Sequence, residues 1–442
     1  MVRTFLWAAV VWGLVGGWAE AQNRDVKLRE DKKKVEAEGF WIYNNLAKGV
    51  EQAKESGKPI VVVLRCVPCT ECVKLDDDLV DRDPRVRPLL EKFVCVRIVS
   101  TNGLDLSLFQ YDYDQSFAVF FLNADGTIYG RFGTRSHRTS WADDVSIDGL
   151  ANALQGALEL HQAYPQNKTA LAGKRGPARD VASPEKYPLL KDKYTDSLNY
   201  EGNVMQSCIH CHQVGDAQRH LRKSKKEEIP EQILFQYPHP KSQGLIMDPR
   251  EKATVLSVEA GSPAAESGFK AGDQIVTLQS QPLLSLADMQ WVLHQTSAAP
   301  GTLAAEVKRG NEKVTLSWNL PKNWRQRDDI SWRASSWPLR RMTTGGMVFD
   351  TLPVEEREKA GLPATSMALR VRSVGQFGLH ATAKKAGFQP GDIIVSVGNR
   401  SDLFRESDYL AHCVNAFQAG QKVPLTFIRQ GKKMTLELPM QE

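Results

Sequence analysis

The stretch MQSCIHCHQ, residues 205–213, contains residues whose types and spacing could do chemistry. Cys208 and Cys211 are separated by two residues, and His212 follows directly. This spacing is typical of haem c, in which two thioethers hold one edge of the porphyrin and the adjacent histidine binds the iron. The same residues could form a redox dithiol, half of a zinc site or a helix-linking disulfide. The pattern favours haem, with His212 as the iron ligand, and leaves the other readings open.

A second cluster, CVPCTEC, places Cys66, Cys69 and Cys72 at intervals of three residues. Such a cluster could be a redox-active dithiol or an inert disulfide. It could also bind a soft metal ion, with Cys95 as a fourth ligand. The complete chain has 7 cysteines. An odd number concentrated in two clusters is a poor structural disulfide framework, so the clusters indicate chemistry.

Length and composition predict a soluble protein of several domains. The chain has 442 residues, of which 42% are hydrophobic and 25% charged, and this length suggests roughly three or four domains. Its net charge of +5 is spread over the whole sequence. We therefore expect no nucleic acid among its partners.

Residues 1–21 have the character of a secretory signal peptide. Arg3 supplies a positive start, Phe5–Val15 is a short apolar run, and Ala19 and Ala21 place small residues where a signal peptidase cleaves. We predict cleavage after Ala21 and a secreted or periplasmic protein. Contact with a membrane is expected only if this segment is retained as an anchor.

Strand and helix patterns alternate over residues 22–164, which predicts a mixed α/β sheet. Short β-branched or aromatic runs predict strands, and an amphipathic pattern predicts a closing helix. The predicted strands cover residues 60–64, 94–99, 118–122 and 127–132, and the helix covers residues 146–161.

Residues 22–164 resemble thioredoxin-like proteins, on the stretches ESGKPIVVVLRCVPCTECVKL and FAVFFLNADGTIYGRF. The resemblance implies a thioredoxin-like fold and places the active-site CxxC on Cys69 and Cys72, with Cys66 as an additional cysteine. A thiolate at a helix N-terminus has a lowered pKa and is nucleophilic. Cys69 would then attack a disulfide, and Cys72 would resolve the mixed disulfide. The family has a cis-proline where this chain has residues 115–117, Gln-Ser-Phe.

Residues 165–238 are polar and contain several prolines, which predicts a linker with a small helical segment carrying the CxxCH motif. An internal repeat follows: SVEAGSPAAESGFKAGDQIVTLQSQPL at 257–283 and SVGQFGLHATAKKAGFQPGDIIVSVGN at 373–399. The two repeats resemble circularly permuted PDZ domains of the HtrA proteases. This resemblance implies two mainly-β PDZ domains, at residues 239–322 and 323–442.

PDZ domains bind protein C-termini or extended peptides by β-augmentation, and a loop of backbone N–H groups captures the terminal carboxylate. The resemblance places this loop and the following strand on matching residues of the two repeats. A pocket for the last ligand side chain would be lined by Ile246, Met289 and Val292. The predicted peptide-binding residues are Gly244, Leu245 and Ile246 in the first repeat, and Gly346, Met347 and Val348 in the second.

These observations predict an extracytoplasmic thiol-disulfide or electron-transfer protein that tandem PDZ domains target to protein partners. No Gly-x-Ser-Gly loop precedes the first repeat and no His-Glu-x-x-His helix occurs, so a protease is not predicted. One alternative is a non-catalytic PDZ scaffold on a structural thioredoxin-like platform. Another is a metal-handling protein that uses Cys66, Cys69 and Cys72.

Overall fold

The structure is a computed structural model that describes residues 24–65, 83–115, 117–134 and 145–442. The chain divides into two compact units. The first unit combines the residues up to Leu221 with Tyr237–Trp324, and the second combines Arg222–Gln236 with Arg325–Glu442. None of the helices in the described ranges is both long enough and apolar enough to cross a bilayer.

The N-terminal part of the first unit is built on a five-stranded mixed sheet with the strand order β1-β3-β2-β4-β5. Strand β2 is central, pairing parallel with β3 and antiparallel with β4. The strands are β1 (Ile42–Tyr43), β2 (Ile60–Arg65), β3 (Val94–Ile98), β4 (Phe117–Leu122) and β5 (Ile128–Thr134).

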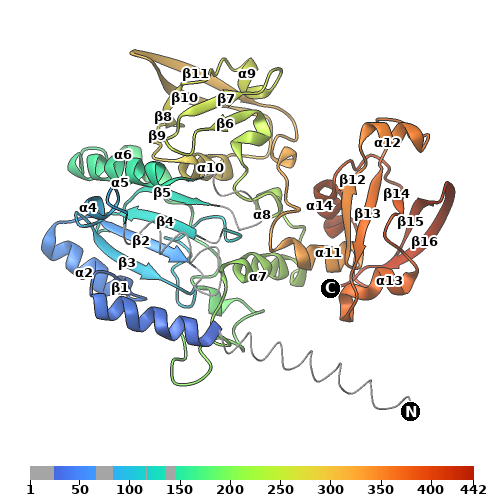
Figure 1. Ribbon diagram of the computed structural model, residues 1–442, viewed down its shortest axis with the longest axis horizontal. Coiled ribbons are helices and arrows are strands. Elements are labelled where there is room, and N and C mark those ends of the chain that lie inside the picture. Colours follow the sequence, from blue (N-terminus) through green and yellow to red (C-terminus); the bar gives the residue numbers. More distant parts are fainter. Residues whose placement is uncertain (1–23, 66–82, 116, 135–144) are drawn as a thin grey trace. The chain divides into compact units, whose positions relative to one another are not determined.

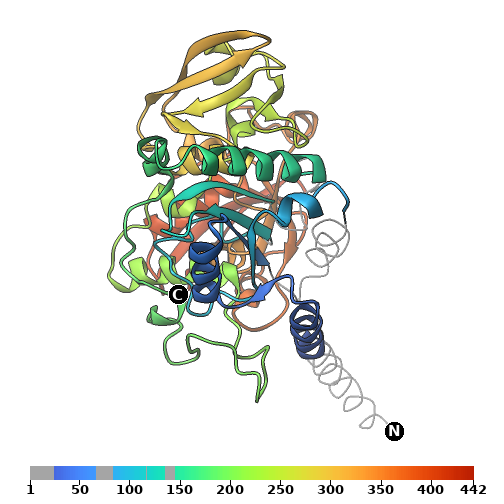
Figure 2. The ribbon, with the colours of Figure 1, turned by 90° about the vertical axis from the view of Figure 1, so that its left-hand side faces the viewer.

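Both faces of this sheet are covered, which explains why every residue of β2 is buried. Helix α5 (Ile147–Gln162) packs on one face, where its Leu154 shares an apolar cluster with Val61. Helix α2 (Leu46–Ser56) packs on the other face, where its Ala53 shares a second cluster with Val62. The helices α2 and α5 lie on opposite sides of the strands in Figure 2. The predicted α/β sheet and closing helix are therefore confirmed.

Helix α5 begins where the sequence predicts. Ser146 is its N-cap, and the Ser146 hydroxyl accepts a hydrogen bond from Gly149 N at 3.0 Å. This cap satisfies one of the backbone donors that the first turn of a helix leaves unpaired.

Residues 165–238, predicted as a linker with a helical segment, are divided between the two units, and the part up to Leu221 packs on the sheet. Tyr187, Leu190 and Ile209 belong to the same buried cluster as Val62 of the central strand. The apolar side chains are sparse in this segment, but they are placed where they cover the sheet. Its helices are α6 (Lys168–Leu171), η3 (Ala172–Lys174), η4 (Pro184–Lys186), α7 (Cys211–Ser224) and α8 (Glu231–Leu234).

The first repeat forms the rest of the first unit. It has a two-stranded sheet, β6-β7, and a four-stranded sheet with the order β11-β10-β8-β9; both lie beside α10 in Figure 1. Its elements are η5 (Pro240–Gln243), β6 (Leu245–Met247), β7 (Val255–Val258), α9 (Pro263–Glu266), β8 (Gln274–Leu278), β9 (Gln281–Pro282), α10 (Leu286–Gln295), β10 (Gly301–Arg309) and β11 (Glu312–Leu320).

Helix α10 joins the first repeat to the N-terminal part of the same unit. Its Asp288 forms an ion pair with Lys174 at 2.9 Å, and both side chains are only 1% exposed. The Asp288 carboxylate also accepts hydrogen bonds from Arg131 N at 3.1 Å and Leu284 N at 3.0 Å. Trp291 Nε1 donates to Gly173 O at 2.9 Å. These contacts tie α10 to β5 and to the segment after α6.

The second unit contains the second repeat, built on a five-stranded sheet with the order β12-β13-β14-β15-β16. Its elements are η6 (Arg325–Arg327), α11 (Ser336–Thr344), β12 (Met347–Thr351), α12 (Val354–Lys359), β13 (Leu369–Val374), η7 (Gly378–Ala381), α13 (Thr382–Ala386), β14 (Ile393–Val397), α14 (Glu406–Ala416), β15 (Lys422–Arg429) and β16 (Lys432–Pro439).

The two repeats share a side-chain clasp, so the internal repeat seen in the sequence is also a structural repeat. In each, one arginine donates through Nε and Nη2 to the two oxygens of an aspartate at 2.7–2.8 Å, and Nη2 also donates to a glycine carbonyl. Bidentate arginine–carboxylate pairs of this kind fix geometry as well as adding energy. The residues are Arg309, Asp273 and Gly268 in the first repeat, and Arg429, Asp392 and Gly387 in the second.

We predict that Asp288→Ala lowers the free energy of unfolding of the first unit by about 3–5 kcal/mol, because it leaves the buried Lys174 cation unpaired and removes the acceptor for two backbone donors. Chemical denaturation of the full chain would measure this loss. Lys168→Met is the control, since Lys168 and Asp125 form an exposed ion pair, and we expect little change. Equal losses in the two variants would contradict the role given to the buried pair.

Candidate functional site

The cysteines predicted to do thiol chemistry, Cys66, Cys69 and Cys72, lie outside the described residues. Cys95, considered as a fourth metal ligand, lies in β3 and is buried. Its thiol donates to the Leu90 carbonyl at a sulfur–oxygen distance of 3.4 Å. Cys95 is therefore part of the apolar core of the sheet.

The CxxCH segment is anchored to the loop that follows β3. Ile209, between the two cysteines, is fully buried. Its carbonyl accepts from Thr101 N at 3.2 Å and from Thr101 Oγ1 at 2.8 Å, and its N–H donates to Asn102 Oδ1 at 2.8 Å. Cys211 then begins α7. The motif is thus held against the sheet by its own backbone.

Cys208 is buried and Cys211 is half-buried, and the thiols of both have a raised pKa. Burial raises the pKa of Cys208 to about 12, although a hydrogen bond with Ser100 opposes the shift. Burial likewise raises the pKa of Cys211, whose sulfur accepts from the Tyr111 hydroxyl at 3.2 Å. Nucleophilic and metal-binding cysteines need the thiolate form. With their pKa raised, these two thiols are weak nucleophiles in the folded state.

The folded arrangement does not fit a haem on Cys208 and Cys211. A porphyrin bonded to both sulfurs would need the space that Tyr111 and Ser100 take up against them. His212, the predicted iron ligand, is half-buried, and its ring stacks parallel to that of His210 at 5.8 Å. No group of three or more potential metal ligands occurs in the described part of the chain.

The first repeat presents a strand edge beside a helix. Strand β6 pairs with β7 alone among the described strands. Leu245 and Met247 of β6 share a buried cluster with Met289 and Val292 of α10. Ile246, predicted to line the ligand pocket, is half-buried and points to the opposite face of β6 from Leu245 and Met247. The apolar contacts between β6 and α10 are made by Leu245 and Met247, the residues on either side of Ile246.

Gly244 occupies a position that only glycine suits. Its φ is +79°, and a Cβ there would lie 2.1 Å from Ser262 Cβ. Its carbonyl accepts from Glu259 N at 2.9 Å, and its N–H donates to Lys241 O at 2.9 Å. The Gly244 N–H, predicted to bind a peptide carboxylate, is therefore already hydrogen-bonded within the η5 turn.

The second repeat has the same loop. Gly346 has a φ of +89°, and a Cβ there would lie 2.0 Å from the His380 carbonyl oxygen. Its carbonyl accepts from Gly375 N at 3.0 Å, and its N–H donates to Arg340 O at 3.2 Å. Met347 and Val348, predicted to bind peptide, are both buried in β12.

Residues that the sequence did not single out lie against α10. Gln290 Nε2 donates to Tyr237 O at 3.1 Å, and Tyr237 N donates to His294 Nδ1 at 3.3 Å. The rings of Tyr237 and His294 stack at 4.0 Å. Trp324 is fully buried, and its carbonyl accepts from Gln243 Nε2 at 2.8 Å. Only the tertiary fold brings these distant residues together, so no local pattern announces them.

Family models match two parts of the chain. Residues 41–124 match the Thioredoxin-like family, and residues 224–320 match the PDZ domain family. The second match covers the first repeat and the segment before it.

Curated relatives are periplasmic proteases of the DegP type. The chain is 25% identical over 194 residues to a "Probable periplasmic serine endoprotease DegP-like" of Halomonas elongata, which covers 42% of this chain and 36% of that protein. It is 37% identical over 62 residues to "Periplasmic serine endoprotease DegP" of Salmonella typhimurium, which covers 14% of this chain and 12% of that protein. The matched region is thus well under two thirds of either relative.

Solved structures of an HtrA-type protease also match. AlgW with a decapeptide is 17% identical, covers 32% of this chain and 44% of that chain, and has a TM-score of 0.20. AlgW with a tripeptide is 17% identical, covers 31% and 48%, and has a TM-score of 0.19. From the two family models, the chain contains a thioredoxin-like domain and a PDZ domain.

Proposed function

We propose that this chain is an extracytoplasmic protein that binds extended segments or C-termini of partner proteins through its PDZ domain and brings them to its thioredoxin-like domain. The signal-like residues 1–21 and the periplasmic relatives support the location. In this proposal the second repeat, residues 323–442, is also a PDZ domain, supported by the clasp that it shares with the first.

The observation that carries the binding proposal is the edge of β6. A strand edge without a partner strand offers N–H and C=O groups to an added peptide strand, and the flanking helix offers apolar contacts. Leu286, the first residue of α10, is half-buried. An apolar residue there leaves the backbone groups of β6 free of a competing side-chain acceptor.

The redox part of the proposal rests on Cys69 and Cys72. The Cys69 thiolate would attack a partner disulfide and release one partner thiol. Cys72 would then attack the mixed disulfide and release the second thiol, leaving a Cys69–Cys72 disulfide. Tethering by the PDZ domain raises the effective concentration of the partner, which compensates for weak intrinsic binding.

Peptide binding to the first repeat is tested with Leu286→Glu in the full chain. A pool of fluorescent decapeptides with free C-termini and an apolar last residue is the probe, read by polarisation, with an amidated pool alongside. We expect binding to weaken at least about tenfold, because the new carboxylate competes for the edge of β6. Val276→Glu, at an exposed position of β8, should bind like the wild type. Equal binding by all three proteins would remove the groove assignment.

The dithiol role is tested by insulin reduction with the wild type, Cys69→Ser and the control Cys66→Ser. We expect Cys69→Ser to lose the activity and Cys66→Ser to keep it, since only the first removes the nucleophile. Full activity in Cys69→Ser would leave the PDZ scaffold as the function. Elemental analysis of the purified chain tests the metal-handling alternative. Metal that is bound to the wild type and depends on the cysteine cluster would favour it.

The thiols of Cys208 and Cys211 should resist iodoacetamide at pH 8 in the native chain and react once it is denatured, because burial raises their pKa. Peptide mapping would measure the alkylation of each residue. Expression with its signal segment in a host that matures c-type cytochromes should add no haem to the intact mass. If the wild type carries a covalent haem and Cys208→Ala does not, the conclusion that Tyr111 and Ser100 fill the space beside the sulfurs is wrong.

A further inference from the structure

The second repeat has a strand and a helix equivalent to β6 and α10, namely β12 and α14. Strand β12 ends the sheet order, so one of its edges has no partner among the described strands. Phe349 follows Gly346 by three residues, as Met247 follows Gly244. Glu406 is the first residue of α14, as Leu286 is of α10.

The edge of β12 is already occupied by side chains of the same chain. Phe349 N donates to Glu406 Oε1 at 2.9 Å, so a residue of α14 reaches across to the strand. Met347 O accepts from Thr344 Oγ1 at 2.7 Å. Groups of this kind are the ones that an added peptide strand would use.

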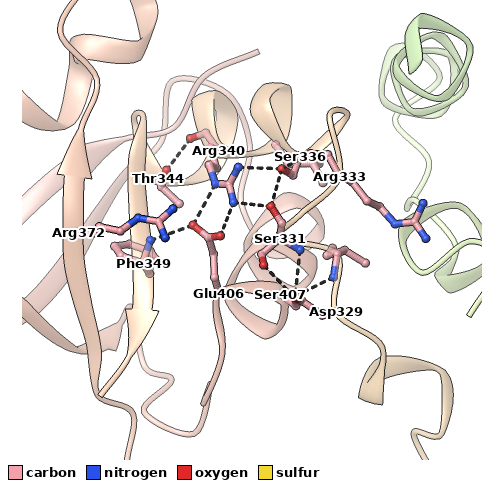
Figure 3. Close-up of polar contacts among 12 residues, drawn as sticks. Asp329, Ser331, Arg333, Ser336, Arg340, Thr344, Phe349, Arg372, Glu406 and Ser407 are labelled. Carbon is pink, nitrogen blue, oxygen red and sulfur yellow. Dashed lines mark hydrogen bonds and ion pairs between the residues drawn. The ribbon is translucent and has the colours of Figure 1, made fainter. Parts of the chain in front are cut away.

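A buried arginine holds Glu406 in this position, as Figure 3 shows. Arg340 Nε donates to Glu406 Oε1 at 3.0 Å, and Arg340 Nη2 donates to Glu406 Oε2. Arg340 also donates to Ser331 O at 2.7 Å and to Ser336 Oγ at 2.8 Å. Both members of the pair are nearly fully buried, each side chain being 4% exposed. The guanidinium is thus fixed on three sides.

Apolar residues of α14 are packed against other parts of the second unit. Leu410 and Val414 of α14 are buried together with Leu339 of α11. Two residues of the segment before the first repeat, Ile229 and Phe235, belong to the same cluster. These apolar contacts fix α14, and with it Glu406, within the second unit.

We propose that the second repeat has a self-occupied peptide groove, in which Glu406, held by Arg340, takes the place of a ligand strand, and that peptides bind the first repeat alone. The two repeats differ at the first residue of this helix, which is Glu406 in α14 and Leu286 in α10. Only the glutamate offers a carboxylate that can accept a hydrogen bond from the strand. The part of this inference that assigns ligands to the first repeat rests on the proposed function. The part that closes the second repeat rests on its own contacts.

The test opens the groove without leaving a buried charge unpaired. Removing Glu406 alone would leave the buried Arg340 cation unpaired and would destabilise the fold. The variant that frees the edge of β12, called the opening variant, is therefore the double substitution Arg340→Met with Glu406→Leu. Its matched control is Arg340→Met with Glu406→Gln, because a glutamine oxygen can still accept from Phe349 N. The readout is hydrogen–deuterium exchange of β6 and β12 in the full chain, with and without the free-acid decapeptide pool.

We expect the peptide pool to leave exchange in β12 unchanged in the wild type and in the glutamine control, and to slow it at least about tenfold in the opening variant. Slowed exchange in wild-type β12, or no slowing in the folded opening variant, would overturn the inference. If the opening variant loses protection in β15 and β16, it has unfolded and the wild-type arm decides. Exchange in β6 tests the proposed function separately, because peptide binding to the first repeat should slow it. Peptide binding at β6 and the occupied edge of β12 can therefore be refuted independently.

Discussion

Helix α10 must satisfy two cores at once, and the first unit is organised around this constraint. Met289, Val292 and Leu293 complete the core of the first repeat. Asp288 binds β5 and the segment after α6, and Trp291, itself part of that core, donates its indole N–H to the same segment. A charged residue on a helix buried on two sides is tolerated only when each of its acceptors is used. Lys174 and two backbone N–H groups provide this, and they thereby fix where the first repeat sits on the sheet.

The two repeats show how one framework supports different surfaces. The arginine–aspartate clasp and the positive-φ glycine before the edge strand are the same in both. The first residue of the flanking helix is not, being Leu286 in one repeat and Glu406 in the other. A framework held by bidentate pairs on buried aspartates keeps its geometry while the residues beside the edge strand vary. Function must therefore be read from the groove of each repeat and not from the shared fold.

Much of the fold could be predicted because its signals are local. The β-branched run at Ile60–Leu64, the cap at Ser146 and the Gly-Phe-x-x-Gly-Asp repeat each act within a few residues. The packing of residues 165–238 could not be predicted, because a few apolar residues such as Tyr187 and Ile209 pack among polar neighbours. The Arg340–Glu406 pair joins residues 66 positions apart. No periodicity reveals such a pair, and the CxxCH motif likewise carries no sign that its thiols are buried.

The thiols of Cys208 and Cys211 are accessible before the chain folds and protected afterwards, so their reactivity depends on when folding occurs. Ser100, in the loop after β3, and Tyr111 contact the two sulfurs and precede them in the chain, so these contacting residues are synthesised before the cysteines. Folding of the sheet and modification of the thiols are then competing reactions of the newly made chain. A reagent that modifies these sulfurs must therefore reach them before the sheet folds over them, and later it meets only protected thiols.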